Sequence, residues 1–478
     1  MVNALLLIAL APFAKGYSLG SDVVDGPSSI ALTPDGGFVL RAAKYWSSSS
    51  QYDGAIVFMD SLGNLVRARS YGWDADHEYF YGITAVSDGY VLAGYTQSIS
   101  GGYDVLVLKV DLSGNVLWYR VLGTTSTDIA HYVLATSDGG FLVTGYTYAR
   151  GGGDALALKL DGSGNLQWAT VWGGSGLDKA YGAVETPSGY FVTGMYNYSS
   201  PEAFLAKLTP SGTLSWMKAY SNSNGSRGYG LVYDGQDLYV TGQMDEYSQA
   251  DALVFKVDTT GGFVGARAYD FAGNEDLFYG ATFDGNLVAV GTARRSSYDM
   301  VVLKVTPTGT LVWAKAFDYG WDEGYSIVPI AGGYAVGFGA GSYNSVLLTD
   351  TNASSPCLAS LSPTVSSPTF TPYTPSDLSS TGMALTVYSP PAISDTNVTP
   401  SYGDLCPAVG ISECSTPSHG VHWEVVDGGI RFRATSPTEI RIYTPSGETV
   451  FSGKVKGETF VPLRRGVYLW KGGKAIVR

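Results

Sequence analysis

Residues 87–118 decide the fold, and they read SDGYVLAGYTQSISGGYDVLVLKVDLSGNVLW. Short runs rich in Val, Leu and Tyr alternate here with the turn pairs Asp88-Gly89 and Ser113-Gly114. Glycine readily supplies the positive φ that tight hairpin turns require, and β-branched and aromatic residues favour strands. With YGITAV before it and YRVLG after it, the stretch predicts four short strands joined by tight turns.

The same pattern recurs along the chain at intervals of about 50 residues. Its relatives include SDGGFLVTGYT from Ser137, DALALKLDGSGNLQW from Asp154, PSGYFVTGM from Pro187 and DMVVLKVTPTGTLVW from Asp299. The aligned units begin at Ser28, Tyr81, His131, Tyr181, Tyr229, Tyr279 and Tyr325. Four strands per unit of this length form the blade of a β-propeller. We therefore predict an all-β protein with a seven-bladed β-propeller over residues 17–350.

Four tryptophans share one position in the fourth strand of their units, and we expect them to pack between adjacent blades as scaffold. They are Trp118, Trp168, Trp216 and Trp313.

The seventh unit ends near Asp350 without a fourth strand. The segment KGYSLGSD from Lys15 is similar to RARSYGWD from Arg67, which belongs to a fourth strand. We predict that residues 17–24 pair into the last blade as its outer strand, because a closed ring leaves no unpaired sheet edge. The propeller is thus expected to be closed by its N-terminal strand.

The recurring Asp-x-x-Gly-x-x-x-Trp of VDLSGNVLW and LDGSGNLQW resembles the blades of quinoprotein dehydrogenases. The repeat also resembles the blades of extracellular bacterial and archaeal propellers. The resemblance covers about residues 17–350 and implies the propeller fold. We find no match here to the calcium site, catalytic Asp or adjacent cysteine pair of quinoproteins. We therefore expect no cofactor and no quinone-dependent activity.

The start of the chain and its composition indicate an exported protein. Ala4–Ala11 is a short apolar run ended by Pro12, which fits the core of a secretory signal. Small residues before Tyr17 permit cleavage after Gly16, so residues 1–16 are interpreted as a signal peptide; a buried first strand is the alternative. The chain of 478 residues carries a net charge of −13, which disfavours nucleic acid as a partner. No later stretch is apolar for about 18 residues, so no transmembrane helix is expected.

Residues 351–416 form an extension rich in Ser, Thr and Pro, as in SPTVSSPTFTPYTPSDLSS. Its alternating small polar and apolar residues are typical of an extended strand or of a linker. In a secreted chain, Cys357 and Cys406 are expected to form a disulfide, with Cys414 left over. The pairings 357–414 and 406–414 remain open. Three unclustered cysteines do not indicate a metal site.

Residues 417–478 contain seven strand-like runs, which predict a small C-terminal β-sandwich. IRIYTPSGETVFSG followed by VPLRRGVYLWKGGKAIVR resembles the C-terminal sorting domain of type IX secretion substrates. The resemblance implies export by that secretion machinery to the cell surface or the medium. The Asn-Pro motif near the start of that domain is absent here, and an ordinary terminal sandwich would produce the same pattern.

Two sets of loop residues are candidates for function, and they should share one face of the propeller. The loops between second and third strands are rich in Tyr, Ser and Gly, a composition suited to adaptable binding. Their candidate ligand-binding residues are Tyr45, Trp46, Tyr95, Tyr146, Tyr148, Tyr196 and Tyr198. The inter-blade loops carry the acids Asp25, Glu78, Asp128, Asp178, Asp276 and Asp322, with Ser226 as the exception. These acids either face a ligand or each accept backbone N–H groups of their own turn.

No catalytic constellation is evident. His77 lies in DADHEY, which no other inter-blade loop repeats, and His131 occupies a position that Tyr holds in most other units. Neither a nucleophile elbow nor a phosphate-binding loop occurs. We therefore predict a secreted or cell-surface protein that binds polysaccharide or protein through its Tyr-rich face. An extracellular glycan-active enzyme with carboxylates at the propeller mouth and a structural envelope protein are the alternatives.

Overall fold

A computed structural model describes most of the chain. The described residues are 13–18; 29–353 apart from 47–50, 74–76, 98–101, 223–224, 245–249, 272–274, 296, 319 and 341–342; the strands and some neighbouring residues of 358–406; and the strands of 421–477. The chain divides into two compact units, Ala14–Leu405 and Met1–Phe13 with Cys406–Arg478. No helix within these ranges has the length and hydropathy of a membrane span.

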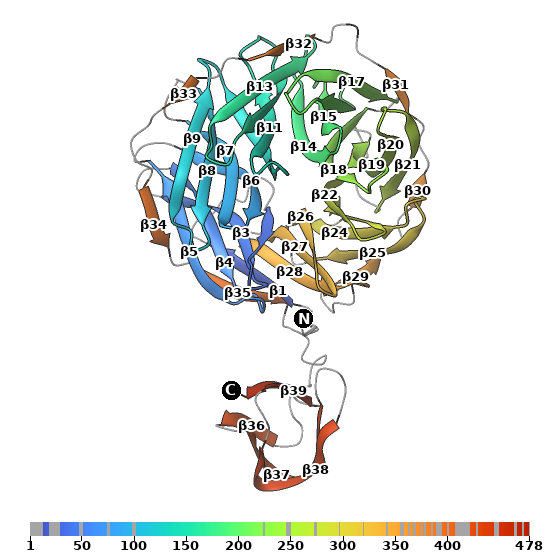
Figure 1. The fold of residues 1–478 in the computed structure, drawn as a ribbon. Helices are drawn as coiled ribbons and strands as arrows, with labels where there is room; N and C mark the ends of the chain where they lie inside the picture. Colours follow the sequence, from blue (N-terminus) through green and yellow to red (C-terminus); the bar gives the residue numbers. More distant parts are fainter. Residues whose placement is uncertain are drawn as a thin grey trace, which may run out of the picture. The chain divides into compact units, whose positions relative to one another are not determined.

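The larger unit is the predicted seven-bladed propeller, with its blades arranged around a central channel (Figure 1). Blades 1 to 3 consist of β2 (Ile30–Leu32), β3 (Phe38–Trp46), β4 (Gln51–Met59) and β5 (Leu65–Gly72); β6 (Glu78–Val86), β7 (Gly89–Thr96), β8 (Asp104–Asp111) and β9 (Val116–Gly123); and β10 (Asp128–Ala135), β11 (Phe141–Thr147), β12 (Asp154–Leu160) and β13 (Leu166–Gly173). Blades 4 and 5 consist of β14 (Lys179–Thr186), β15 (Gly189–Tyr196), β16 (Glu202–Leu208) and β17 (Leu214–Ser221); and β18 (Ser226–Tyr233), β19 (Asp237–Met244), β20 (Asp251–Asp258) and β21 (Phe263–Asp270). Blade 6 consists of β22 (Asp276–Phe283), β23 (Leu287–Arg294), β24 (Tyr298–Val305) and β25 (Leu311–Phe317), and blade 7 begins with β26 (Asp322–Ile330), β27 (Gly333–Ala340) and β28 (Tyr343–Asp350).

The ring is closed by an N-terminal strand, as predicted, but the strand lies earlier in the sequence. β1 (Phe13–Ser18) follows β28 in the sheet order β26-β27-β28-β1-β35, so it is the fourth strand of blade 7. The predicted segment 17–24 overlaps it only at Tyr17 and Ser18, and residues 19–24 lie outside the described ranges. The sequence similarity that predicted this strand begins at Lys15. In the structure the strand begins two residues earlier, at Phe13, and Ala14 within it is buried.

Neighbouring blades share their hydrophobic cores. The cluster between blades 1 and 2, for example, includes Phe58 and Tyr90, whose ring centroids are 5.7 Å apart. Trp118 and Trp168 pack across blade boundaries against Phe141 and Tyr190, as expected of scaffold residues.

Two further details concern the scaffold tryptophans. Trp216 contacts Phe191 of its own blade and also packs against the core shared with blade 5, and the Trp313 ring lies 6.4 Å from that of Tyr334 in blade 7, so all four tryptophans lie between blades as predicted. The Trp168 ring also explains a turn glycine in the next blade. A Cβ on Gly212, which has a φ of +84°, would lie 2.4 Å from that ring.

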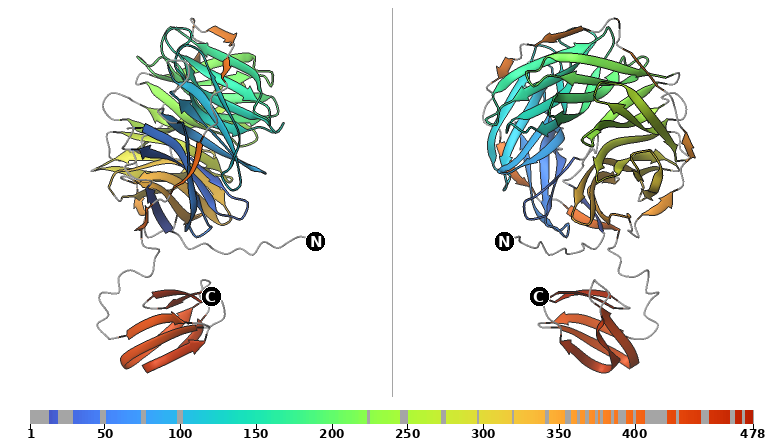
Figure 2. Two further views of the ribbon diagram at one scale, coloured as in Figure 1. Left: turned by 90° about the vertical axis from the view of Figure 1, so that its left-hand side faces the viewer. Right: turned by 45° about the vertical axis from the view of Figure 1, so that its right-hand side comes forward.

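The Ser/Thr/Pro-rich extension forms a belt, which we define as strands β29 to β35, around the rim of the propeller (Figures 1 and 2). Each belt strand pairs with the outer strand of one blade as a fifth strand, and the belt visits blades 6, 5, 4, 3, 2, 1 and 7 in that order. Its members are β29 (Ala359–Leu361), β30 (Thr364–Ser366), β31 (Thr371–Tyr373), β32 (Ser379–Gly382), β33 (Thr386–Tyr388), β34 (Ser394–Val398) and β35 (Ser401–Cys406). Each blade has the four strands predicted for it, and the extension, for which strand and linker were both open, adds a fifth.

The composition of the belt suits its position. Short strands and prolines at a sheet edge discourage pairing with a further strand, because proline donates no backbone hydrogen bond. Apolar residues between the strands anchor the belt: Phe370 is buried and its ring lies 5.5 Å from that of Phe255. The disulfide prediction falls outside the described residues at Cys357 and Cys414, and only the backbone of Cys406 is described.

The C-terminal unit contains five strands instead of the seven predicted runs. They are β36 (Val421–Val426), β37 (Gly429–Tyr443), β38 (Thr449–Pro462), β39 (Gly466–Trp470) and β40 (Gly473–Val477). Two pairs of runs are merged in the long strands β37 and β38, which pair with each other across an irregularity between Ala434 and Thr438. Polar interruptions in the sequence therefore mark a change of register and not a turn.

Candidate functional site: an aromatic collar in the central channel

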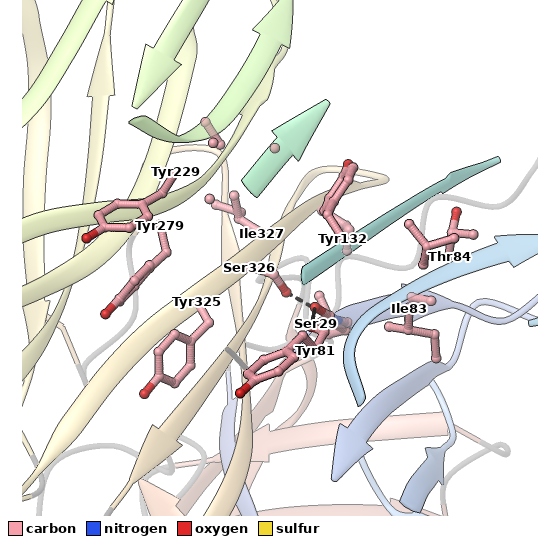
Figure 3. A pocket seen from close by; sticks show the side chains of 18 of the residues that line it. Ser29, Tyr81, Ile83, Thr84, Tyr132, Tyr229, Tyr279, Tyr325, Ser326 and Ile327 are labelled. Carbon is pink, nitrogen blue, oxygen red and sulfur yellow. Dashed lines mark hydrogen bonds between the residues drawn. The ribbon is translucent and has the colours of Figure 1, made fainter. Parts of the chain in front are cut away.

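Six aromatic side chains, one from each of blades 2 to 7, form a collar inside the channel. Neighbouring rings have centroids 4.9 to 5.1 Å apart. The collar consists of Tyr81, His131, Tyr181, Tyr229, Tyr279 and Tyr325. Blade 1 contributes Ser29, whose hydroxyl donates to the Tyr81 carbonyl at 2.8 Å. Figure 3 shows four of the tyrosines in an arc, with their hydroxyl groups on the same side.

Irregular pairing in the inner strands directs these rings into the channel. In each of blades 2 to 7 the register between the first and second strands shifts at the collar residue, as between Phe80 and Gly82 around Tyr81. A β-bulge leaves its extra residue unpaired and re-aims its side chain. The glycine that often follows permits close contact between blades, because a Cβ on Gly182 would lie 2.6 Å from the Tyr229 carbonyl oxygen.

A cavity of about 720 Å³ adjoins the collar on the side of the turns between first and second strands. Apart from the collar, its lining is mainly aliphatic and includes Ile83, Val133, Leu231 and Ile327 (Figure 3). The collar therefore lies between an apolar cavity and the opposite face of the ring, which we call the mouth. The mouth is surrounded by the inter-blade loops and by the loops between second and third strands.

The residues two positions before the collar differ from blade to blade, unlike the collar itself. We call them the mouth layer: Tyr79, Ile129, Lys179, Arg227, Leu277 and Glu323. Residues i and i−2 of a strand share a face, and the Tyr79 and Tyr81 rings are 5.1 Å apart across the bulge. The mouth layer is thus aromatic at blade 2, cationic at blades 4 and 5, and acidic at blade 7.

Aromatic residues from the second and third strands continue the wall of the mouth at blades 2 and 3. Tyr95 lies 6.0 Å from Tyr79 and 4.8 Å from Tyr103. Tyr146 stacks on His131 at 5.4 Å and contacts Tyr148 edge-on at 5.7 Å. At blade 7, the Trp321 ring lies 4.4 Å from Tyr298, and its N–H donates to Glu323 at 3.0 Å.

The collar is electrically neutral. Burial, and next the charge of Lys179, lower the pKa of His131 to about 3. Burial likewise raises the pKa of Tyr181, Tyr229 and Tyr279, so these hydroxyls stay protonated. His131 Nε2 is buried and has no hydrogen-bond partner. The collar thus consists of uncharged rings, and His131 contributes a buried imidazole nitrogen without a hydrogen-bond partner.

The predicted ligand-binding tyrosines divide into exposed and buried groups. Tyr148 and Tyr198 are 38% and 54% exposed, as a binding role requires. The prediction of exposed loops is wrong for Tyr146 and Tyr196, which are buried because they still belong to second strands: Tyr146 is next to last in β11, and Tyr196 is last in β15. Tyr95 is half-buried, and the side chains of Tyr45 and Trp46 lie outside the described residues.

The described inter-blade acids lie inside the blade boundaries and not at the mouth. Glu78, Asp128, Asp178, Asp276 and Asp322 are all buried. Each accepts a backbone N–H of its own loop, donated by Trp73, Thr124, Gly174, Phe271 and Gly320 respectively, at 2.6 to 3.1 Å. The geometry therefore supports the local capping role, and Asp25 lies outside the described residues.

One group of described acids has the spacing of a metal site. Oxygen atoms of Asp299, Asp318 and Asp322 lie within 4.8 Å of one another. However, Arg295 Nε lies 2.5 Å from Asp299, so a guanidinium already supplies positive charge there.

Asp276 makes the stability of the propeller depend on pH. Burial raises the pKa of Asp276 to about 7, opposed by the Phe271 N–H and assisted by the charges of Asp270 and Asp251. The folded protein therefore binds this proton more tightly than the unfolded chain, and the stabilisation is lost as the pH rises through about 7. We expect the change Asp276→Asn to stabilise the protein by about 2 kcal/mol more at pH 8.5 than at pH 5.5, measured by urea unfolding. The control Glu275→Gln, at an exposed neighbouring carboxylate, should show the same effect at both pH values; a pH-independent effect of Asp276→Asn would contradict the assignment.

Comparisons with known proteins find solved structures of similar fold but no family for this chain. No family model matches the sequence, and no curated protein matches it. Similar solved structures include Sqt1 of Chaetomium thermophilum, at 13% identity and a TM-score of 0.41 over 71% of this chain and 98% of that one. The periplasmic gluconolactonase PpgL of Pseudomonas aeruginosa has 14% identity and a TM-score of 0.42 over 63% and 94%. A subtype N11 neuraminidase-like protein of A/flat-faced bat/Peru/033/2010 has 12% identity and a TM-score of 0.33 over 73% and 99%.

Proposed function

We propose that this protein is a secreted or cell-surface binding protein that holds a saccharide chain at the mouth of the propeller channel. The aromatic collar is the observation that carries the proposal. Six rings in mutual contact form a wide, uncharged surface at the base of the mouth. Sugar rings present C–H faces and hydroxyl groups, and aromatic side chains with polar edges match both.

Exposed aromatic residues around the mouth support the same function. Tyr148, Tyr198 and Trp321 are 38%, 54% and 58% exposed and come from three different blades. Side chains placed this way contact a ligand longer than one sugar unit, which suits a polysaccharide. Five acids that the enzyme alternative would require at the mouth are buried in blade boundaries instead. Binding without turnover is therefore the better supported function.

Export is part of the proposal and rests on the ends of the sequence. The apolar run Ala4–Ala11 supports a secretory signal, and the resemblance of residues 417–478 to a sorting domain supports type IX secretion.

The test is binding to a panel of neutral and acidic polysaccharides, followed by titration calorimetry on oligosaccharides. Replacing Tyr148, Tyr198 and Trp321 together by Ala should weaken binding at least about 10-fold, because each aromatic contact contributes about 0.5–1.5 kcal/mol. The matched control replaces Leu117, Val264 and Val312, which are exposed on outer strands, and should bind like the parent. Unchanged binding by the mouth variant would place the site elsewhere, release of shortened products would favour the enzyme, and no binding at all would favour the structural protein.

A further inference from the structure

Two cationic side chains occupy equivalent positions in the mouth layer. Lys179 and Arg227 each lie two residues before a collar tyrosine, on β14 and β18, and these inner strands are neighbours. Burial lowers the pKa of Lys179, and the charge of Arg227 lowers it further, which places the two cations within range of each other. Like charges repel at such range, so their shared position requires another source of stabilisation.

Aromatic faces hold both cations in place. Lys179 Nζ lies 4.4 Å from the centroid of the Tyr146 ring, and Arg227 Cζ lies 5.3 Å from that of Tyr198. A cation over an aromatic face is stabilised by the ring quadrupole but keeps its charge. Within the described part of the chain, Lys179 forms no ion pair. Its neighbour Asp178 faces away and accepts the N–H groups of Gly174 and Asn197.

Blade 5 departs from the repeat at the residue directly before Arg227. The inter-blade acid present in the other blades is replaced in blade 5 by Ser226, directly before Arg227. Ser226 is buried and accepts the N–H of Ala203, which lies in β16 of blade 4, at 3.0 Å, so a neutral hydroxyl stands where the other blades carry a carboxylate. A chain with a net charge of −13 thus carries two neighbouring cationic side chains on one side of its mouth. The opposite side, at blade 7, carries Glu323.

We infer that the mouth selects an acidic saccharide, with a carboxylate or sulfate group of the ligand between Lys179 and Arg227 and its sugar ring on the neighbouring tyrosines. This inference rests on the proposed saccharide binding and specifies the class of ligand. Charge-assisted contacts of both cations with one anion would replace their mutual repulsion by attraction. Glu323 would repel the same group, which fixes the direction in which the chain lies across the mouth.

The test compares two ligands that differ only in charge: an oligomer of galacturonic acid and its fully methyl-esterified form. We expect the parent protein to bind the acid at least about tenfold more tightly than the ester at low ionic strength. Lys179→Met should reduce this ratio to about one to threefold, mainly because the acid binds more weakly. Lys179→Arg, which keeps the charge, should retain the preference and also shows that the position tolerates substitution. The control Lys218→Met, on an outer strand, should behave like the parent.

Two results would overturn the inference: equal binding of acid and ester by the parent, or an unchanged preference in Lys179→Met. If the ester or other neutral saccharides bind and the Tyr148, Tyr198 and Trp321 variant loses this binding, the proposed function stands and only the charge selectivity fails. If no saccharide on the panel binds, both fail together.

Discussion

A chain that ends at Asp350 is expected to unfold several kcal/mol more easily than one that ends at residue 416, and to aggregate. The shorter chain lacks the belt, and the longer one retains it without the C-terminal unit. Removing the belt exposes the backbone groups of the outer strand of every blade, and unpaired edges are templates for association. It also uncovers apolar surface now covered by Phe370, whose burial alone is worth about 1.5–3 kcal/mol. Urea unfolding and light scattering measure both effects.

A single substitution tests the belt without changing chain length. Phe370 packs against Phe255 at 5.5 Å and Phe263 at 5.7 Å, so Phe370→Ala should destabilise the propeller by about 3–5 kcal/mol. Phe370→Leu, which keeps most of the volume, is the control and should have a much smaller effect. If the chain ending at Asp350 were monomeric and melted within a degree or two of the longer chain, the belt would not stabilise the ring.

The closing strand is expected to have a similarly large effect. A chain that begins at Tyr17 retains two of the six residues of β1, and both β28 and β35 lose their partner. We expect this chain to lose several kcal/mol of unfolding free energy or to fail to fold, because a whole paired strand of blade 7 is removed. A chain that begins at Pro12 retains the strand and should match the full-length protein in urea unfolding.

The position of β1 also limits where a signal peptide can be removed without loss of the closing strand. Cleavage after Gly16, the site predicted from the sequence, would remove most of the closing strand. We therefore expect the intact mass of the native protein, measured separately from cells, surface and medium, to show an N-terminus at or before Phe13. A stable native protein that begins at Tyr17 would show that blade 7 closes without the first four residues of β1.

The candidate site was only partly predictable from the sequence. The aromatic residue at the same position of the repeats was visible and was used to align the units, but its periodicity by itself favours scaffold. What turns Tyr81 and its equivalents into a site is the β-bulge that directs each ring toward the axis. A bulge depends on pairing with the next strand, and nothing in the local sequence distinguishes it from regular pairing. Similarly, Tyr146 and Tyr148 are two residues apart in one loop motif, yet one is buried and the other is exposed.

The seven blades, the closure by an N-terminal segment and the scaffold role of the four repeated tryptophans could all be predicted from local sequence. Hydrophobic alternation and turn glycines specify hairpins, and the repeat specifies their number. The course of the belt, the collar and the charge pattern of the mouth depend instead on contacts between segments that are distant in the chain. The belt strand that contains Thr371 and the outer strand that contains Ser221 are far apart in the chain, and their pairing leaves no local signature. The same is true of Lys179 and Arg227, which become one cationic surface only because the ring places two inner strands side by side.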